Sequence, residues 1–188
     1  ITSIADQVKA AFPGVAVRFA FIAYRDHADQ MGGNDSNHFE EFDFSDDVPA
    51  LKTFIGGVEA IGGGDAPEDI AGGLHKTLAL PWCASTRCLI LVADAPCHGS
   101  KFHSCGGSYP GGDPNGLDPL AQMVLLREKA INFAFYSANS TTDQMGRMFA
   151  DAYRGGHYEM EIKKLGDAAA FQTQAVGTIT KSIRVGRA

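Results

Sequence analysis

Apolar residues alternate along this chain between helical and extended spacing, and this alternation constrains the fold more than any other feature. The clearest strand is the apolar run 88–93, which ends at Asp94. The runs 15–24 and 131–136 are similarly apolar, with β-branched and aromatic members, as in strands buried on both faces. Helical segments separate the runs. Crossover connections and a mainly parallel sheet with helices on both faces are therefore expected.

Helix signals support the same reading. Ser45 or Asp46 is a plausible N-cap for the second helix, and Asp118-Pro119 is a typical helix start. Apolar periodicity predicts helices over residues 2–12, 48–61, 67–80, 119–129, 141–153 and 167–183. Phenylalanines among acidic residues predict an edge strand near 39–44, and residues 157–162 read as extended. The predicted fold class is a Rossmann-like, doubly wound α/β domain.

Length and charge narrow the function classes. A chain of 188 residues suits one domain, here 1–188. Its net charge of -6, without a basic run, argues against nucleic acid or an anionic membrane as the main partner. No apolar stretch approaches the roughly 18 residues of a membrane-spanning helix. No signal peptide is visible, which favours an intracellular, cytoplasmic setting.

The cysteines leave several readings open. Cys83, Cys88, Cys97 and Cys105 contain no CxxC pair. Free thiols, or one Cys97–Cys105 disulfide across a loop, are favoured. A zinc site built from Cys97, His98, His103 and Cys105 is a weaker alternative, based on the clustering of suitable ligand types.

Acidic residues follow the predicted strands. Asp26 comes after the first strand, Asp94 ends the run 88–93, and a glycine turn between them leads into Asp65 and Glu68. The carboxyl ends of parallel strands share one sheet edge, so these groups should lie near one another. Crowded carboxylates repel unless they are protonated or bridged by a cation. All-oxygen ligands predict Mg²⁺, or Mn²⁺ or Ca²⁺, in place of zinc.

Each of these residues also has an ordinary structural explanation. Asp65 followed by Glu68 is a normal helix start, with Asp at the N-cap and Glu three residues later. Asp94 suits a turn cap, and Asp26 suits a loop. The occurrence of all three at strand-to-helix junctions favours the metal site. His27 and His98 are the only base candidates, and lone loop histidines are expected to be solvated.

The order of these elements resembles the von Willebrand factor type A (vWA) family, most closely the vWA domains attached to atypical α-kinases. Four stretches carry the likeness, and they are residues 24–27, 62–69, 93–99 and 109–117. The turn at Asp65 to Glu68 is also similar to integrin β I-like domains. The resemblance implies that Glu68 and Asp94 belong to a central metal-ion-dependent adhesion site (MIDAS). It implies that Asp65 and Asp26 lie beside that site.

One departure from the family is large. The family's metal site includes an Asp-x-Ser/Thr-x-Ser loop after a central first strand, and this chain has no such loop. Residues 1–12 resemble the latter part of the helix that follows that loop. The expectation is that an N-terminal segment is omitted, so that the sheet of residues 1–188 lacks its middle strand.

The resemblance implies a protein-interaction module and not an enzyme. A divalent cation would keep one position open for a carboxylate of a partner protein. The loop 97–117 would form the rim of that position, and His98, His103, Tyr109 and Asp113 would contact the partner. A self-packed surface insertion is the alternative for this loop.

Two other function classes stay open. The first is a degenerate vWA scaffold that binds partners without metal. The second is a metal-assisted hydrolase or phosphotransferase that uses the same carboxylates. Against the enzyme, the sequence contains no P-loop, GxGxxG or nucleophile elbow. By the resemblance, a kinase domain would lie elsewhere in a full protein and not in these residues.

Overall fold

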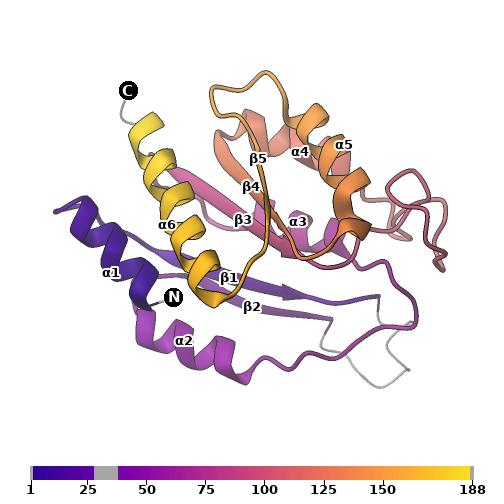
Figure 1. Cartoon of the computed structure of the whole chain (residues 1–188), viewed down its shortest axis with the longest axis horizontal. Coiled ribbons are helices and arrows are strands. Elements are labelled where there is room, and N and C mark those ends of the chain that lie inside the picture. The colour runs from indigo at the N-terminus through magenta and orange to yellow at the C-terminus, as the bar shows by residue number, and fades with distance from the viewer. Residues whose placement is uncertain (1, 28–37, 187–188) are drawn as a thin grey trace.

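A computed structural model describes residues 2–27 and 38–186 of the chain. Within this part, five strands form two separate sheets (Figure 1). Strands β3 (Arg87–Ala93), β4 (Ile131–Ser137) and β5 (Glu161–Lys164) form a parallel sheet in the order β3-β4-β5. Strands β1 (Phe19–Tyr24) and β2 (Phe39–Ser45) form an antiparallel pair. The α/β class is therefore confirmed, whereas the strands do not join into one continuous sheet.

Helices cover both faces of the parallel sheet. They are α1 (Thr2–Ala11), α3 (Ile70–Ala79), α4 (Pro119–Glu128), α5 (Asp143–Tyr153) and α6 (Ala168–Val185), with a short 3₁₀ turn η1 (Ser140–Thr142). Helix α2 (Val48–Gly57) packs instead against the antiparallel pair of β1 and β2. Side chains of α3, α4 and α5 pack on one face against Phe133 and Phe135 of β4. Side chains of α1 and α6 pack on the other face against Ala134 and Tyr136. This alternation places β4, buried along its whole length, at the centre of the core.

The capping residues predicted from the sequence differ from those in the structure at two helices. Asp118 caps α4 as predicted, accepting a hydrogen bond from the amide of Leu120. Helix α2 is capped by Asp47 and not by Ser45 or Asp46. Helix α3 is capped by Asp69 and not by Asp65, which accepts instead from the amide of Ser108. The correction at α3 matters because it leaves Asp65 outside the helix, on the side of the loop 97–117.

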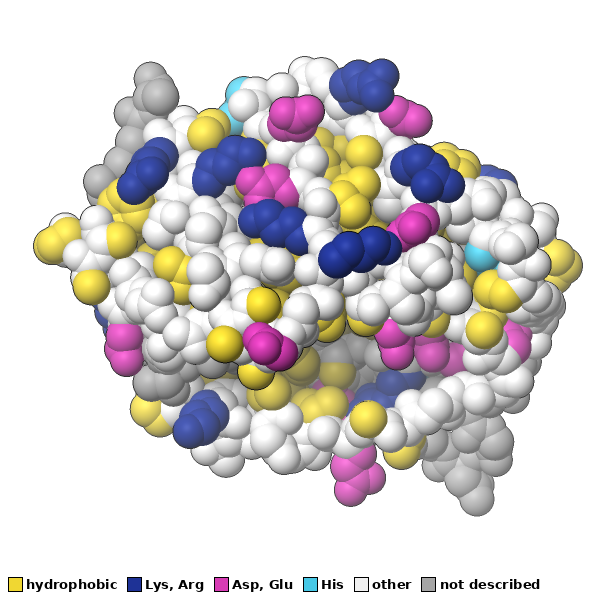
Figure 2. Space-filling view, in the orientation of Figure 1, with side chains coloured by type: hydrophobic (Ala, Val, Ile, Leu, Met, Phe, Trp, Pro, Cys, Tyr) yellow, Lys and Arg dark blue, Asp and Glu magenta, His cyan; other side chains and the backbone are white. Residues whose placement is uncertain are grey.

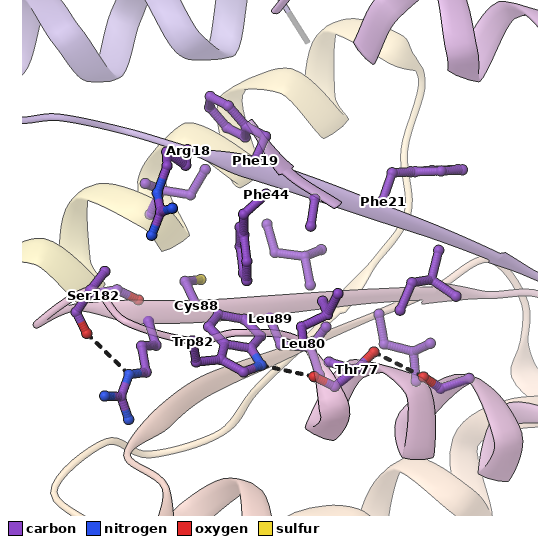
Figure 3. A pocket seen from close by; sticks show the side chains of 18 of the residues that line it. Arg18, Phe19, Phe21, Phe44, Thr77, Leu80, Trp82, Cys88, Leu89 and Ser182 are labelled. Atoms are coloured by element: carbon purple, nitrogen blue, oxygen red, sulfur yellow. Dashed lines mark hydrogen bonds between the residues drawn. The ribbon is translucent and has the colours of Figure 1, made fainter. Parts of the chain in front are cut away.

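A cavity of about 910 Å³ separates the two sheets, and residues of β1 and β3 line it together. In Figure 3, Arg18, Phe19 and Phe44 lie on one side of this cavity, and Cys88 and Leu89 lie on the other. Every residue of β1 is only half-buried, as are the first four residues of β3. The expectation that both strands are buried on both faces is therefore wrong, because each has the cavity beside it.

The two strands that line the cavity run in the same direction. At their carboxyl ends, the hydroxyl of Tyr24 donates to the carbonyl of Val92, with 3.1 Å between the oxygens. At the opposite end, the guanidinium of Arg18 contacts the sulfur of Cys83, just before β3 begins. One extended segment placed between them would meet the edge of β1 on one side and the edge of β3 on the other.

The surface in Figure 2 shows no continuous basic area. Lys and Arg side chains lie among Asp and Glu on this face, and hydrophobic side chains line a hollow that crosses it. Among the residues that the structure describes, no helix has the length and apolar character needed to cross a lipid bilayer.

Candidate metal site

Three segments meet at the carboxyl ends of β1 and β3. The amide of Asp69 donates to the carbonyl of Arg25 at 3.1 Å, which fixes the start of α3 beside the end of β1. The amide of Glu68 donates to the carbonyl of Pro96 at 2.9 Å, which fixes the same turn beside the segment after β3. The acidic stretches that lie far apart in the sequence are therefore held together by backbone hydrogen bonds.

Asp26 is fully buried within this junction. Its Oδ1 accepts from the amide of His27 at 2.8 Å and lies 2.9 Å from Nε2 of His98. Its Oδ2 has no hydrogen-bond partner among the described residues. Asp26, Asp65 and His98 offer ligand atoms that lie within 4.8 Å of one another, so they form one group that could hold a metal ion.

A glycine makes this close packing feasible. A Cβ atom on Gly63 would lie 2.3 Å from the Cβ of Asp26, far inside van der Waals contact. Gly63, the middle glycine of the run 62–64, is therefore required for packing against Asp26. The run is not followed by the Lys-Ser/Thr of a phosphate-binding loop.

Glu68 and Asp94 lie beside this group but do not belong to it. Both line the cavity between the sheets, at its carboxyl end. Burial raises the pKa of Glu68 to about 7, and the carboxylates of Asp26, Asp94, Asp65 and Asp69 contribute in that order. Oε2 of Glu68 is buried and has no hydrogen-bond partner among the described residues. Asp94 is exposed, and its carbonyl accepts from Asn139 and Thr141.

The raised pKa of Glu68 predicts a pH effect in the metal-free protein. The folded state keeps the Glu68 proton up to about pH 7, whereas the unfolded state loses it near the ordinary value of 4.5. The folded state therefore binds more protons in that window, and the free energy of unfolding should fall as pH rises from about 4.5 to 7. Urea denaturation in EDTA at several pH values should show this fall, reduced in Glu68→Gln. An equal fall in the variant would contradict the assignment.

A second group of metal-ligating side chains lies next to the first. It consists of His27, His38 and Asp69, whose ligand atoms also lie within 4.8 Å of one another. Nε2 of His38 is 2.9 Å from Oδ2 of Asp69, and Nδ1 of His27 is 3.6 Å from the same oxygen. Burial lowers the pKa of His38 and raises the pKa of Asp69, so desolvation disfavours the charged form of each.

The sequence points to little of this second group. His38 and Asp69 belong to no recognisable ligand motif, and His27 is expected to be solvated. The structure corrects that expectation, because His27 and His98 are 4% and 3% exposed. Their rings lie 5.1 Å apart, which makes the two groups neighbours. The available signal was Asp69, the third acidic residue of the stretch 62–69 that leads into α3.

The four residues predicted at the rim lie at different depths. His98 and His103 are buried, and the imidazole of His103 hydrogen-bonds the carbonyl of Cys105. Tyr109 is half-buried with its ring edge-on to His27 and His98. The side chain of Asp113 is 2% exposed. The loop 97–117 thus packs over the site in this structure, and contact of these residues with a partner stays a prediction.

The cysteines are free thiols in the structure. Cys97 is buried, Cys88 and Cys105 are half-buried, and Cys83 is exposed. Burial raises the pKa of Cys97 well above its usual range, so this thiol stays protonated at neutral pH. Among the described residues, Cys97 and Cys105 do not form a metal-ligating group with His98 and His103.

Comparison with known proteins gives one informative relative. The chain is 34% identical over 151 residues to Alpha-protein kinase vwkA of Dictyostelium discoideum. The alignment covers 79% of this chain but only 23% of the relative, so the chain spans less than a quarter of that protein's length. No protein-family model matches the chain.

Proposed function

We propose that this chain is a vWA-type domain that binds a partner protein through a divalent cation. The observation that carries the proposal is a set of unsatisfied buried oxygens on neighbouring carboxylates of this junction. Oδ2 of Asp26, Oδ1 of Asp65 and Oε2 of Glu68 are all buried without a hydrogen-bond partner among the described residues. Unpaired buried carboxylate oxygens are costly, and a cation that bridges them removes the cost.

The donor chemistry favours a hard cation. Carboxylate oxygens from Asp26, Asp65, Glu68 and Asp94 suit Mg²⁺, or Mn²⁺ or Ca²⁺. Glu68 and Asp94 would hold the ion at the carboxyl end of the cavity, and Asp65 and Asp26 would support it from the buried side. When bound, the cation would offer an open position to a carboxylate of the partner. The loop 97–117 packs over the buried side, so the exposed Asp94 marks the side for partner approach.

The cavity between the sheets offers a place for the central strand that the vWA family has and this chain lacks. Because β1 and β3 run in the same direction with unpaired edges toward the cavity, it suits one extended apolar strand parallel to both. Such a strand would end beside Glu68 and Asp94, which line the carboxyl end of the cavity. A loop that follows it there would bring the Asp-x-Ser/Thr-x-Ser oxygens of the vWA family to the same cation. A longer form of the chain would supply that strand.

The relation to an alpha-protein kinase supports a wider proposal. The domain would belong to a longer protein in which a kinase domain lies outside these residues. Its task there would be to position the kinase on a partner through the proposed cation site.

A calorimetric titration tests the metal proposal. Mg²⁺ added to a form extended ahead of α1 should bind at one site, and Asp94→Ala should weaken that binding at least about 10-fold, because it removes one charged oxygen ligand. Asp151→Ala is the matched control, since its side chain is 67% exposed on α5, in a salt bridge with Arg154. A folded, extended form that binds no Mg²⁺, Mn²⁺ or Ca²⁺ would favour the degenerate scaffold.

A further inference from the structure

The second group, His27, His38 and Asp69, has the spacing of a tetrahedral metal site. Ligand atoms about 2.0–2.1 Å from a tetrahedral zinc ion lie about 3.3 Å from one another. The distances from Oδ2 of Asp69, 2.9 Å to His38 and 3.6 Å to His27, lie on either side of that value. Nε2 of His38 makes no hydrogen bond among the described residues in spite of its short contact. The contact therefore has the spacing of two ligands and not the alignment of a hydrogen bond.

Two of the three ligands, Asp69 and His27, have a further contact behind them. Oδ1 of Asp69 accepts from the amide of Gly72 at 2.6 Å, which leaves Oδ2 directed at the two histidines. Nε2 of His27 lies 3.3 Å from Oδ2 of Asp113, near this carboxylate but without the alignment of a hydrogen bond. A proton on Nε2 would leave Nδ1 free as a ligand. Asp113 is itself fixed, because its Oδ1 accepts from the amides of Asn115 and Leu117. A carboxylate behind a metal-bound histidine is a common way to set its tautomer and orientation.

We propose that His27 Nδ1, His38 Nε2 and Asp69 Oδ2 bind a zinc ion. Two imidazole nitrogens and one carboxylate suit zinc and related transition metals, and they are unsuited to Mg²⁺ or Ca²⁺. A cavity of about 340 Å³ lies beside the group and is lined by His38 and Asp69 together with His75 and Asn115. It gives water or a small ligand access to the fourth coordination position.

This site differs from the proposed magnesium site in reaching β2, the second strand of the antiparallel pair. His27 follows β1, His38 immediately precedes β2, and Asp69 caps α3. A zinc ion would therefore tie both strands of the antiparallel pair to the helix that packs on the parallel sheet. Zinc should hold these elements in place even when no strand fills the cavity between the sheets. The inference does not depend on the proposed partner binding.

The test is zinc binding to the purified chain, measured by competition with a chromophoric chelator and by Co²⁺ absorption. One Zn²⁺ per chain is expected, with visible Co²⁺ bands typical of a four-coordinate site. His38→Gln should weaken zinc binding at least 100-fold, because it removes one of only three protein ligands. His75→Gln is the matched control and should bind as tightly as the wild type, since His75 lies beside the cavity but outside the group. Equal binding by His38→Gln and the wild type would overturn the proposal.

Two further variants keep the test decisive. His38→Cys restores a zinc ligand and should recover most of the lost affinity, which a purely structural role of His38 would not. Asp113→Asn should weaken binding about 10–100-fold while all three ligands remain. Mg²⁺ binding by the extended form should be unchanged in His38→Gln, so failure of one metal proposal is distinguishable from failure of the other. Absence of zinc binding in a folded wild-type chain would also overturn the inference.

Discussion

A form of the chain that carries an extended apolar strand ahead of α1 is expected to be more stable by at least about 3 kcal/mol, the contribution of one to two fully buried large apolar side chains. The strand would fill the 910 Å³ cavity and pair with both β1 and β3. Its side chains would meet the apolar residues that are now half-buried, such as Phe19 and Leu89. The added backbone hydrogen bonds would offset part of the entropy lost when the strand becomes ordered.

Urea denaturation measures this effect. The extended form should unfold at a higher urea concentration and with a larger m-value, because more surface is exposed on unfolding. The matched control is the same extension with charged residues at its apolar positions, which lengthens the chain without filling the cavity. An identical midpoint for the two extended forms would show that the added strand does not enter the gap between the sheets.

Phe102→Ala is expected to lower the free energy of unfolding by about 3–5 kcal/mol, as for other fully buried phenylalanines. Phe102 is 0% exposed, and its ring lies edge-on to Phe149 of α5 with 6.1 Å between centroids. It belongs to the loop 97–117 and packs in the core cluster. The substitution should therefore also weaken zinc binding, because the loop carries Asp113, which orients His27.

Chemical denaturation and the chelator competition measure the two effects separately. Leu125→Ala is the control for truncation, since Leu125 is 43% exposed on α4 and should change stability by less than about 1 kcal/mol. Loss of stability in Phe102→Ala without any change in zinc affinity would contradict the role of the loop in orienting His27.

Local sequence signals predicted the elements that depend on local interactions. Asp118 followed by Pro119 marks the start of α4 because the cap is made within one turn. The apolar run at 131–136 becomes the buried strand β4 because helices cover both of its faces. The runs that form β1 and β3 are similarly apolar, yet β1 and the first four residues of β3 are only half-buried. Their burial depends on a neighbouring strand, which composition alone does not reveal.

The other features of the site depend on contacts between residues that are far apart in the sequence. Asp65 and Asp69 are both suitable caps for the same helix, and the amide of Ser108 in a distant loop occupies Asp65. His27, His38 and Asp69 fit no spacing motif, because the antiparallel pair of β1 and β2 and a helix start bring them together. The carboxylates were expected together because the ends of parallel strands share one edge of a sheet. In the structure β1 and β3 lie in separate sheets, and backbone hydrogen bonds from Glu68 and Asp69 hold the acidic stretches together. His98 was expected to lie at the rim of the site. In the structure it is buried, and its partner Asp26 is buried as well.

The most direct test of the central claim is to locate a bound divalent cation by paramagnetic broadening. Mn²⁺ would be added at low stoichiometry to the ¹⁵N-labelled extended form, with EDTA to reverse the effect. The account predicts that the amide signals of Asp65, Glu68 and Asp94 broaden first, and that Asp94→Ala removes this broadening. Broadening that begins at exposed acidic residues such as Asp151, or that is the same in Asp94→Ala, would contradict a metal-dependent binding site at the carboxyl ends of β1 and β3.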